Sequence, residues 1–347
     1  MPVPVSKAKP LVKPLVLAVT GPTAAGKTDL AIQLSECFPI ELINMDSAQI
    51  YQSMDIGTAK ISPELRARYP HHLMDIISPE AHYSVAQFVT DVNDLVAQIT
   101  QRGNIPLLVG GTMLYYKALI DGLATLPAAD SSLRKQLHHT LAQHGHQALR
   151  DELSQIDAAL AASIQGNDTQ RLIRFVEIAR LTGRAPSELF AEQQAPASFH
   201  FFHIAFFPDN RQWLHQRIEQ RFDAMLALGL VDEVRALQRQ YTLSAEHPSM
   251  RCAGYRQVWQ YLAGEYDHIQ RTRQHNKTNT AWEEMRERGI FATRQLAKRQ
   301  LTWLRKIPAD IIIPDPLKVD FLTIKSAINA KIDAEINAEI DTPKSPP

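Results

Sequence analysis

The feature that most constrains this chain is a glycine-rich turn near its N-terminus, Gly21-Pro22-Thr23-Ala24-Ala25-Gly26-Lys27-Thr28. It fits the pattern G-x-x-x-x-G-K-[ST], with an apolar β-branched run before it and apolar residues at helical spacing after it. The glycines let successive backbone N–H groups point at a phosphate chain, and the start of the helix adds partial positive charge. Lys27 adds a full charge, and the Thr28 hydroxyl suits Mg²⁺. With both flanks in place, a polyphosphate site is favoured over a chance glycine loop, although the motif does not specify which polyphosphate.

The segments after this turn alternate between strand and helix patterns. Strands are expected at 41–46, 105–109, 199–207 and 311–313, and helices at 28–38, 83–101, 113–123 and 211–240. Such alternation is typical of a parallel, doubly wound sheet. We therefore predict an α/β fold: a P-loop-type parallel sheet flanked by helices, with an inserted helical subdomain and a helical C-terminal third.

The expected domain boundaries follow from changes in pattern. We expect an N-terminal extension over 1–14, a catalytic core formed by 15–126 and 199–315, a helical insertion over 127–198, and a low-complexity tail over 316–347, in which 327–347 is a frayed helix or disordered. No apolar run approaches the ~18 residues that cross a bilayer, so no membrane association is expected. The two cysteines, Cys37 and Cys252, are too few for a disulfide framework or a zinc site, which fits a reducing cytoplasm.

The charge of the chain sums to zero but is unevenly distributed. Between Arg251 and Lys306 there are twelve Lys and Arg residues against five acids, a local net charge of +7. A basic stretch can supply phosphate contacts inside a neutral protein. A solvated helix face would give the same count, and the count alone favours that plainer interpretation.

The acids near the glycine-rich turn bear on whether the chain hydrolyses a nucleotide. A motor-type NTPase needs an acid at the end of a neighbouring apolar strand to hold Mg²⁺. The strand 105–109 ends instead in Gly110-Gly111-Thr112, and the nearest strand-end acid is Asp46. A carboxylate at this sheet edge can act as a general base toward an acceptor, and a turn or helix-cap role is equally compatible with the segment. The second glycine turn either brings Thr112 to the site or serves packing alone.

Three further segments mix cations with aromatic and amide side chains. They are Gln170-Arg171-Leu172-Ile173-Arg174, Arg251-Cys252-Ala253-Gly254-Tyr255-Arg256 and Lys298-Arg299-Gln300-Leu301-Thr302-Trp303-Leu304-Arg305. That mixture suits RNA, because cations contact phosphates, flat rings stack on bases and amides bind base edges. Either aromatic ring, Tyr255 or Trp303, is also compatible with a place in the core.

Taken together, these segments resemble the tRNA dimethylallyltransferase family, also called tRNA isopentenyltransferase, of bacterial type. The matching stretches run in family order over about residues 15–306: G-P-T-A-A-G-K-T at 21–28, D-S-A-Q-I-Y at 46–51, M-D-I-G-T-A-K at 54–60, G-G-T-M-L-Y-Y-K-A-L at 110–119, L-P-A-A-D at 126–130 with Arg134, D-T-Q-R-L-I-R at 168–174, Q-R-F-D-A-M-L at 220–226, R-C-A-G-Y-R-Q at 251–257 and R-Q-L-A-K-R-Q-L-T-W-L-R at 294–305. The ordered set is far more specific than any single stretch. The segment 267–281 looks like an insertion, and the tail after about 316 has no counterpart.

The resemblance implies a reaction and a set of residue roles. Dimethylallyl diphosphate, not ATP, would occupy the P-loop, and the acceptor would be N6 of the adenosine immediately 3′ of the tRNA anticodon. Asp46 would be the general base, while Thr23, Lys27 and Arg221 would hold the diphosphate with Mg²⁺. The helical insertion would clasp the anticodon stem-loop. The residues implied to contact tRNA are Asp46, Ser47, Ala48, Gln49, Thr112, Arg134, Gln170, Arg171, Leu172, Ile173, Arg174, Arg251, Cys252, Ala253, Gly254, Tyr255, Arg256, Lys298, Arg299, Gln300, Leu301, Thr302, Trp303, Leu304 and Arg305.

Two other functions share parts of this pattern. A small-molecule kinase also places a P-loop on a parallel sheet, but it has no use for an Arg- and Trp-rich C-terminal third. A non-catalytic RNA-binding protein with a vestigial P-loop would tolerate the loss of Lys27 or Asp46. We expect a monomeric enzyme that acts in the cytoplasm.

Overall fold

The computed structural model describes residues 13–166, 168–192, 198–267 and 280–341. The chain divides into two units, the first formed by the residues up to Tyr116 and from Ser198 onward, and the second by Lys117–Ala197. The second unit begins inside helix α4 (Met113–Asp121), earlier than the position 127 expected from the sequence. No helix of the described residues is long and apolar enough to cross a membrane.

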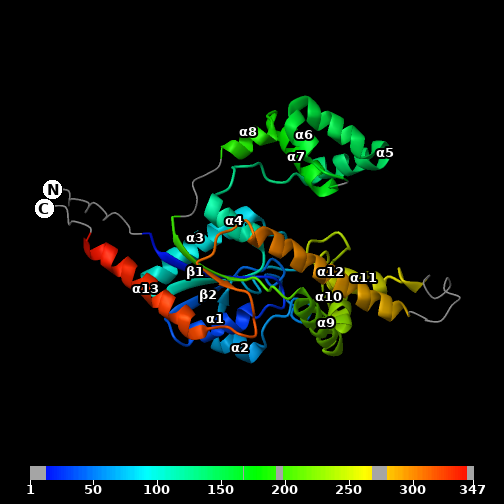
Figure 1. Cartoon of the computed structure of the whole chain (residues 1–347). Helices are drawn as coiled ribbons and strands as arrows, with labels where there is room; N and C mark the ends of the chain where they lie inside the picture. Colours follow the sequence, from blue (N-terminus) through cyan, green and yellow to red (C-terminus); the bar gives the residue numbers. More distant parts are fainter. Residues whose placement is uncertain (1–12, 167, 193–197, 268–279, 342–347) are drawn as a thin grey trace, which may run out of the picture. The chain divides into compact units, whose positions relative to one another are not determined.

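A six-stranded parallel sheet lies at the centre of the first unit, with the strand order β3-β2-β4-β1-β5-β6 (Figure 1). The strands are β1 (Leu15–Thr20), β2 (Ile40–Asn44), β3 (His71–His72), β4 (Ile105–Gly110), β5 (His200–Phe206) and β6 (Ile311–Ile313). The predicted α/β class is therefore confirmed. The sequence did not reveal β3, because two residues are too few to show any periodicity.

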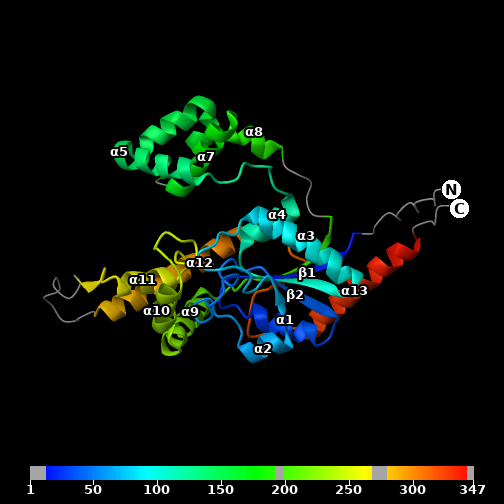
Figure 2. The ribbon, with the colours of Figure 1, turned by 180° about the vertical axis from the view of Figure 1, so that it is seen from behind.

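Helices cover both faces of this sheet, as Figures 1 and 2 show from opposite sides. Successive strand residues point to opposite faces, so Leu17 and Val19 of β1 pack with α1 (Lys27–Ser35) on one face. On the other face, beside α3 (Val85–Gln101), the ring of Tyr116 in α4 packs 4.7 Å from that of His203 in β5. Between β2 and β3 the chain forms the short helix α2 (Pro63–Arg68).

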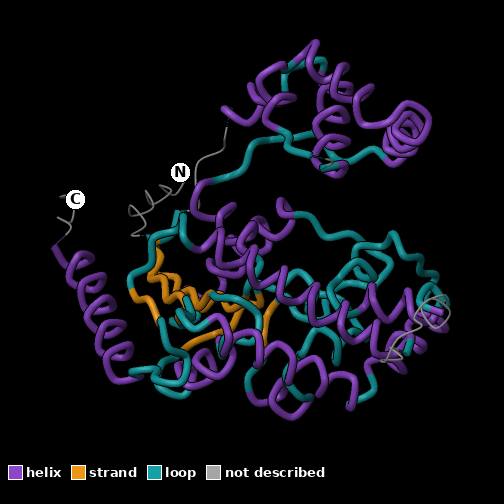
Figure 3. The backbone as a smooth tube through the Cα atoms, turned by 45° about the vertical axis from the view of Figure 1, so that its right-hand side comes forward, coloured by secondary structure: helices purple, strands orange, loops and turns teal. Residues whose placement is uncertain are grey.

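Among the described residues, four helices between β5 and β6 form a second hydrophobic core: α9 (Arg211–Ala227), α10 (Leu230–Gln240), α11 (Tyr255–Leu262) and α12 (Ala281–Leu304). Figure 3 draws the helices of the chain in purple and its strands in orange. The single helix expected over 211–240 is wrong. Gly229 interrupts it with φ of +98°, a left-handed conformation that glycine adopts at little cost and that ends a helix. The break lets Leu230 begin a new helix and enter the core beside Phe222.

The C-terminal tail is more ordered than its composition indicates. Helix α13 spans Phe321–Asp341, and Ile324 and Ile328 are only 2% and 0% exposed because they pack into the core beneath β5 and β6. The helix alternative expected for 327–347 is therefore confirmed as far as Asp341, and the start of this helix is packed rather than frayed, because Ile324 and Ile328 lie four residues apart on one face and are both buried. Residues 342–347, and most of the insertion expected at 267–281, lie outside the described residues.

The second unit is helical and has its own core. It contains α5 (Ser131–Ile156), α6 (Ala158–Ser163), α7 (Thr169–Thr182) and α8 (Pro186–Ala191). Leu137, Leu149 and Leu153 of α5 pack against Leu172 and Val176 of α7. These buried leucines define the inner faces of α5 and α7.

Candidate active site

The carboxyl ends of three neighbouring strands bring the predicted site residues together. β1 runs into the P-loop, β2 leads to Asp46, and β4 ends in the turn Gly110-Gly111. These strands are adjacent in the order β2-β4-β1, and their carboxyl ends share one edge because all three are parallel. Gly110 is required there, since a Cβ at this position would lie 2.1 Å from the Met45 carbonyl oxygen.

The P-loop curls in the way that phosphate binding needs. Ala24 and Gly26 take left-handed conformations, with φ of 66° and 93°. The Lys27 ammonium donates a hydrogen bond to the Pro22 carbonyl at 2.7 Å and is held inside the loop. Burial lowers the pKa of Lys27 to about 8, against an opposing effect of the Asp46 carboxylate, and the Arg221 guanidinium lowers it further. A dianionic group bound here would offset this desolvation.

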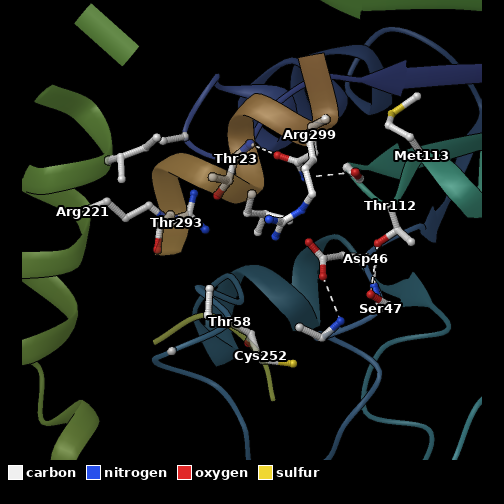
Figure 4. Close-up of a pocket in the computed structure, with 18 of the residues that line it drawn as sticks. Thr23, Asp46, Ser47, Thr58, Thr112, Met113, Arg221, Cys252, Thr293 and Arg299 are labelled. Atoms are coloured by element: carbon white, nitrogen blue, oxygen red, sulfur yellow. Dashed lines mark hydrogen bonds between the residues drawn. The ribbon is translucent and has the colours of Figure 1, made fainter. Parts of the chain in front are cut away.

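Asp46 forms a local turn and also faces the site. One carboxylate oxygen, Oδ1, accepts the Ala48 backbone N–H at 2.9 Å, so the turn role left open by the sequence is present. Figure 4 shows the carboxylate projecting into a cavity, with Arg299 on one side and Thr58 and Cys252 on the other. Beside it, the Thr112 hydroxyl accepts the Ser47 N–H at 3.0 Å and ties β4 to the Asp46 segment. Forming the turn therefore does not remove Asp46 from the cavity.

The positive charge opposite Asp46 comes from α9. Burial lowers the pKa of Arg221, an effect that the nearby Asp46 carboxylate opposes. Cys252 lies on the other side of Asp46, and burial raises the pKa of its thiol to about 12 with a further contribution from that carboxylate. The thiol is therefore protonated at neutral pH and is a poor nucleophile, so Asp46 is the better candidate for a reactive side chain.

Two cavities meet at this point. The P-loop cavity, of about 480 Å³, is lined by the P-loop together with Gln49, Lys60 and Arg217. The Trp303 cavity, of about 450 Å³, is lined by Thr112, Arg251, Cys252, Arg299 and Trp303 among others. Both volumes suit a small molecule or a single base. The residues common to both walls are Thr23, Ala24, Asp46, Arg221, Leu296 and Gln300.

The residues implied by the resemblance to bind tRNA divide into three groups in the first unit: residues that line a cavity, residues that are buried in the protein, and the exposed residues Arg256, Lys298, Thr302 and Arg305. Those that line a cavity are Asp46, Ser47, Ala48, Gln49, Thr112, Arg251, Cys252, Ala253, Arg299, Gln300 and Trp303. Gly254 is buried instead. Tyr255, Leu301 and Leu304 are also buried, Tyr255 in the helical core, and the Tyr255 hydroxyl donates to Glu233 at 2.5 Å. These three side chains stabilise the fold rather than face a ligand. The alternative that Tyr255 belongs to the core is the one that the structure favours.

In the second unit, the arginines expected to bind RNA surround a buried carboxylate. Glu177 is 0% exposed and accepts hydrogen bonds from Arg134 Nε at 2.9 Å and from Arg174 Nη1 at 2.6 Å. Leu172 and Ile173 lie in the core of this unit, so their side chains are packing residues. Arg171 is exposed.

Sequence reasoning missed Glu233, which fixes one wall of the Trp303 cavity. Its carboxylate accepts the backbone N–H groups of Asp55, Ile56 and Gly57 at 2.9, 2.7 and 3.1 Å. Gly57 lines the cavity, and a Cβ there would lie 2.5 Å from the Tyr255 ring. An acid in the first turn of a helix ordinarily indicates only a favourable interaction with the helix dipole, so the sequence carried no specific signal.

Comparisons with known proteins agree on one family. Residues 49–307 match the family model described as IPP transferase. The chain is 52% identical to a tRNA dimethylallyltransferase of Aromatoleum aromaticum over 295 residues, which cover 85% of this chain and 88% of that protein. It is 50% identical to a tRNA dimethylallyltransferase of Legionella pneumophila over 291 residues, or 84% and 88% of the two chains.

Solved structures give the same result. A tRNA isopentenylpyrophosphate transferase of Bacillus halodurans superposes with a TM-score of 0.64 at 33% identity, over 94% of this chain and 99% of that one. A eukaryotic dimethylallyltransferase acting on tRNA superposes with a TM-score of 0.72 at 27% identity, over 93% and 80% of the two chains. On the family model, the curated relatives and the solved structures together, the chain belongs to the IPP transferase family.

Proposed function

We infer that this chain is a tRNA dimethylallyltransferase, which transfers the dimethylallyl group of dimethylallyl diphosphate to N6 of the adenosine immediately 3′ of the anticodon and releases diphosphate. The observation that carries this inference is the wall shared by the two cavities. A diphosphate ester in the P-loop cavity and a base in the Trp303 cavity would meet at Asp46, Thr23 and Arg221, which line both.

The P-loop cavity suits the donor. Its backbone N–H groups, Lys27 and Arg221 would stabilise the negative charge that grows on the departing diphosphate. Thr28 supplies a hydroxyl for Mg²⁺, and among the described residues no cluster of three His, Cys, Asp or Glu side chains is placed to hold a metal alone. Thr28 would hold the ion beside a bound phosphate group. Bound there, Mg²⁺ would supply further charge neutralisation.

The Trp303 cavity suits the acceptor. It presents the Trp303 ring for stacking, Arg251 and Arg299 for phosphates, and the Asp46 carboxylate for the exocyclic amine. The adenine would leave the base stack to enter this cavity, as bases do in other enzymes that modify them. In the second unit, Arg134, Arg171 and Arg174 offer further contacts to the stem-loop.

The reaction forms one C–N bond, breaks one C–O bond and transfers one proton. The N6 nitrogen forms a bond to the allylic carbon, the bond from that carbon to the diphosphate oxygen breaks, and Asp46 takes the proton that N6 loses. A positioned general base is worth about 10²–10⁴-fold in rate. Because the step needs no hydrolysis of a nucleotide, the strand-end metal acid of an NTPase is not needed at the end of β4.

One experiment separates this function from its rivals. The protein is incubated with labelled dimethylallyl diphosphate or with γ-labelled ATP, each with and without a tRNA anticodon stem-loop. Label transferred from the diphosphate ester to the adenosine supports the proposal. Label transferred from ATP to a small molecule would indicate a kinase, and stem-loop binding without any transfer would indicate a binding protein. We propose that the enzyme acts as a monomer in the cytoplasm. Sedimentation tests the oligomeric state, and cell fractionation tests the location.

A further inference from the structure

Gln300 of α12 connects the two glycine turns of the site. Its side-chain oxygen Oε1 accepts the backbone N–H of Thr23 in the P-loop at 2.8 Å. Its side-chain nitrogen Nε2 donates to the backbone carbonyl of Gly111 at 2.9 Å. The residue is 8% exposed and lies in the wall shared by both cavities, and Figure 4 draws the hydrogen bond at Thr23 as a dashed line.

Only an amide satisfies both partners. The Thr23 N–H needs an acceptor and the Gly111 carbonyl needs a donor, so a carboxylate or an apolar side chain of the same length would leave at least one unpaired. The fit is also steric, because a Cβ at Gly111 would lie 2.4 Å from Gln300 Nε2. Gly111 is thus the residue that lets the amide approach the turn.

Both partners of Gln300 adjoin residues with proposed roles. Thr23 is the P-loop residue assigned to the diphosphate, and Gly111 precedes Thr112, which contacts the Asp46 segment through Ser47. The same helix also carries Arg299 and Trp303 into the Trp303 cavity. Gln300 therefore joins the helix proposed to contact tRNA to the P-loop and to the turn beside the general base.

We propose that Gln300 is a positioning residue, a clamp that fixes the P-loop relative to the Gly111 turn, and not a residue that contacts tRNA. This inference rests on the proposed function and assigns a role within the same site. Its side chain is committed to two backbone groups of the protein, so its effect on transfer acts through the placement of Thr23 and Thr112. Because a displacement of about 1 Å at reacting groups costs about 10²-fold in rate, loss of the clamp should be visible in turnover.

The test uses Gln300→Met in the full chain, which keeps the length and removes both hydrogen bonds. We expect single-turnover transfer to fall about 10–100-fold at saturating donor and stem-loop. Affinity for inorganic diphosphate, measured by calorimetry, should weaken about fivefold, because the free energy of the lost hydrogen bond that holds Thr23 in place must then be supplied on binding. Affinity for the stem-loop alone should stay unchanged. Gln295→Met is the matched control, because Gln295 lies on the same helix among the described residues and lines neither cavity.

A double-mutant cycle is a second test of the clamp, and its Gly111→Ala arm keeps Gln300 intact if Gln300→Met folds poorly. Gly111→Ala places a methyl group against the amide, so it should slow transfer in the native chain and have less effect in a Gln300→Ala chain. Wild-type transfer and diphosphate affinity in Gln300→Met, or strictly additive effects in the cycle, would overturn the proposal. So would weaker stem-loop binding as the only change, which would make Gln300 an RNA contact. If the wild-type chain transfers no dimethylallyl group, the proposed function fails. The difference in diphosphate affinity between wild type and Gln300→Met then decides alone whether the clamp exists.

Discussion

Replacing Asp46 by asparagine separates its two roles in the site. Oδ1 of Asp46 accepts the Ala48 N–H at 2.9 Å, and the amide oxygen of an asparagine can accept the same hydrogen bond. The asparagine amide cannot take a proton from N6 at neutral pH. Asp46→Asn should therefore keep the turn and lose the base, whereas Asp46→Ala should lose both.

The structure sets the size of each effect. The turn hydrogen bond involves a half-buried side chain, so its loss in Asp46→Ala should destabilise the protein by about 1 kcal/mol. Loss of the base should slow transfer by about 10²–10⁴-fold in both variants. Donor binding should not weaken, because the lost carboxylate is a negative charge beside the diphosphate site.

Single-turnover transfer to an anticodon stem-loop, read beside thermal melting, is the assay. The expected pattern is that both variants are slow and that only the alanine variant melts earlier. A melting temperature equal to wild type and undiminished transfer in Asp46→Asn would refute the assignment of Asp46 as the base. An alanine variant much slower than the asparagine variant would show that the turn, not proton transfer, matters.

Three further changes probe the surroundings of Asp46. Affinity for inorganic diphosphate should decrease as pH rises above about 8, because the Lys27 ammonium, whose pKa is lowered, loses its charge there. Titration calorimetry of Lys27→Arg should show less of this decrease, because the arginine stays charged. Arg299→Ala should weaken stem-loop binding, and in filter-binding assays the slope of log affinity against log salt concentration should become shallower by about 0.7–0.9 per lost phosphate contact. Replacing the exposed Arg235 by alanine is the control, and an unchanged slope in Arg299→Ala would contradict a phosphate contact. Glu233→Gln should lower the free energy of unfolding by about 1–3 kcal/mol in denaturant titrations, since a side-chain NH₂ would face the backbone N–H donors of residues 55–57. If Glu233→Gln were as stable as the control Glu246→Gln, the 55–57 segment would not depend on the carboxylate.

The sequence predicted the sheet and the core of the site because both follow from local patterns. The P-loop signature, the alternation of strands and helices, and the glycines after β4 each depend on a few neighbouring residues. Parallel pairing then forces the carboxyl ends of adjacent strands to one edge, which brought Asp46 to the P-loop without any knowledge of contacts. The meeting of these residues at one edge of the sheet was therefore predictable from the sequence.

The remaining features depend on contacts between distant residues. Gln300 lies 277 positions from Thr23, and Glu233 lies 177 positions from Ile56, so no local pattern connects them. The break at Gly229 was missed because one glycine within a continuous amphipathic pattern lowers helix propensity without excluding a helix. A family motif also does not distinguish a ligand contact from a core residue, which is why Tyr255 and Gln300 were both assigned to tRNA.

The same limit applies to the basic stretch, and it changes how the electrostatics of this face should be understood. Arg286 donates to Asp223 and Glu219 of α9, and Arg294 donates to Glu219 as well, so acids outside the counted stretch neutralise part of its charge. A surplus of +7 along the sequence therefore overstates the field that RNA meets. Arg299 differs from Arg286 and Arg294 in its position, because it lines the Trp303 cavity and is the neighbour of Gln300 in the sequence. RNA affinity should thus depend on a few placed cations, and substitutions of Arg286 or Arg294 should act mainly through the packing of α12 on α9.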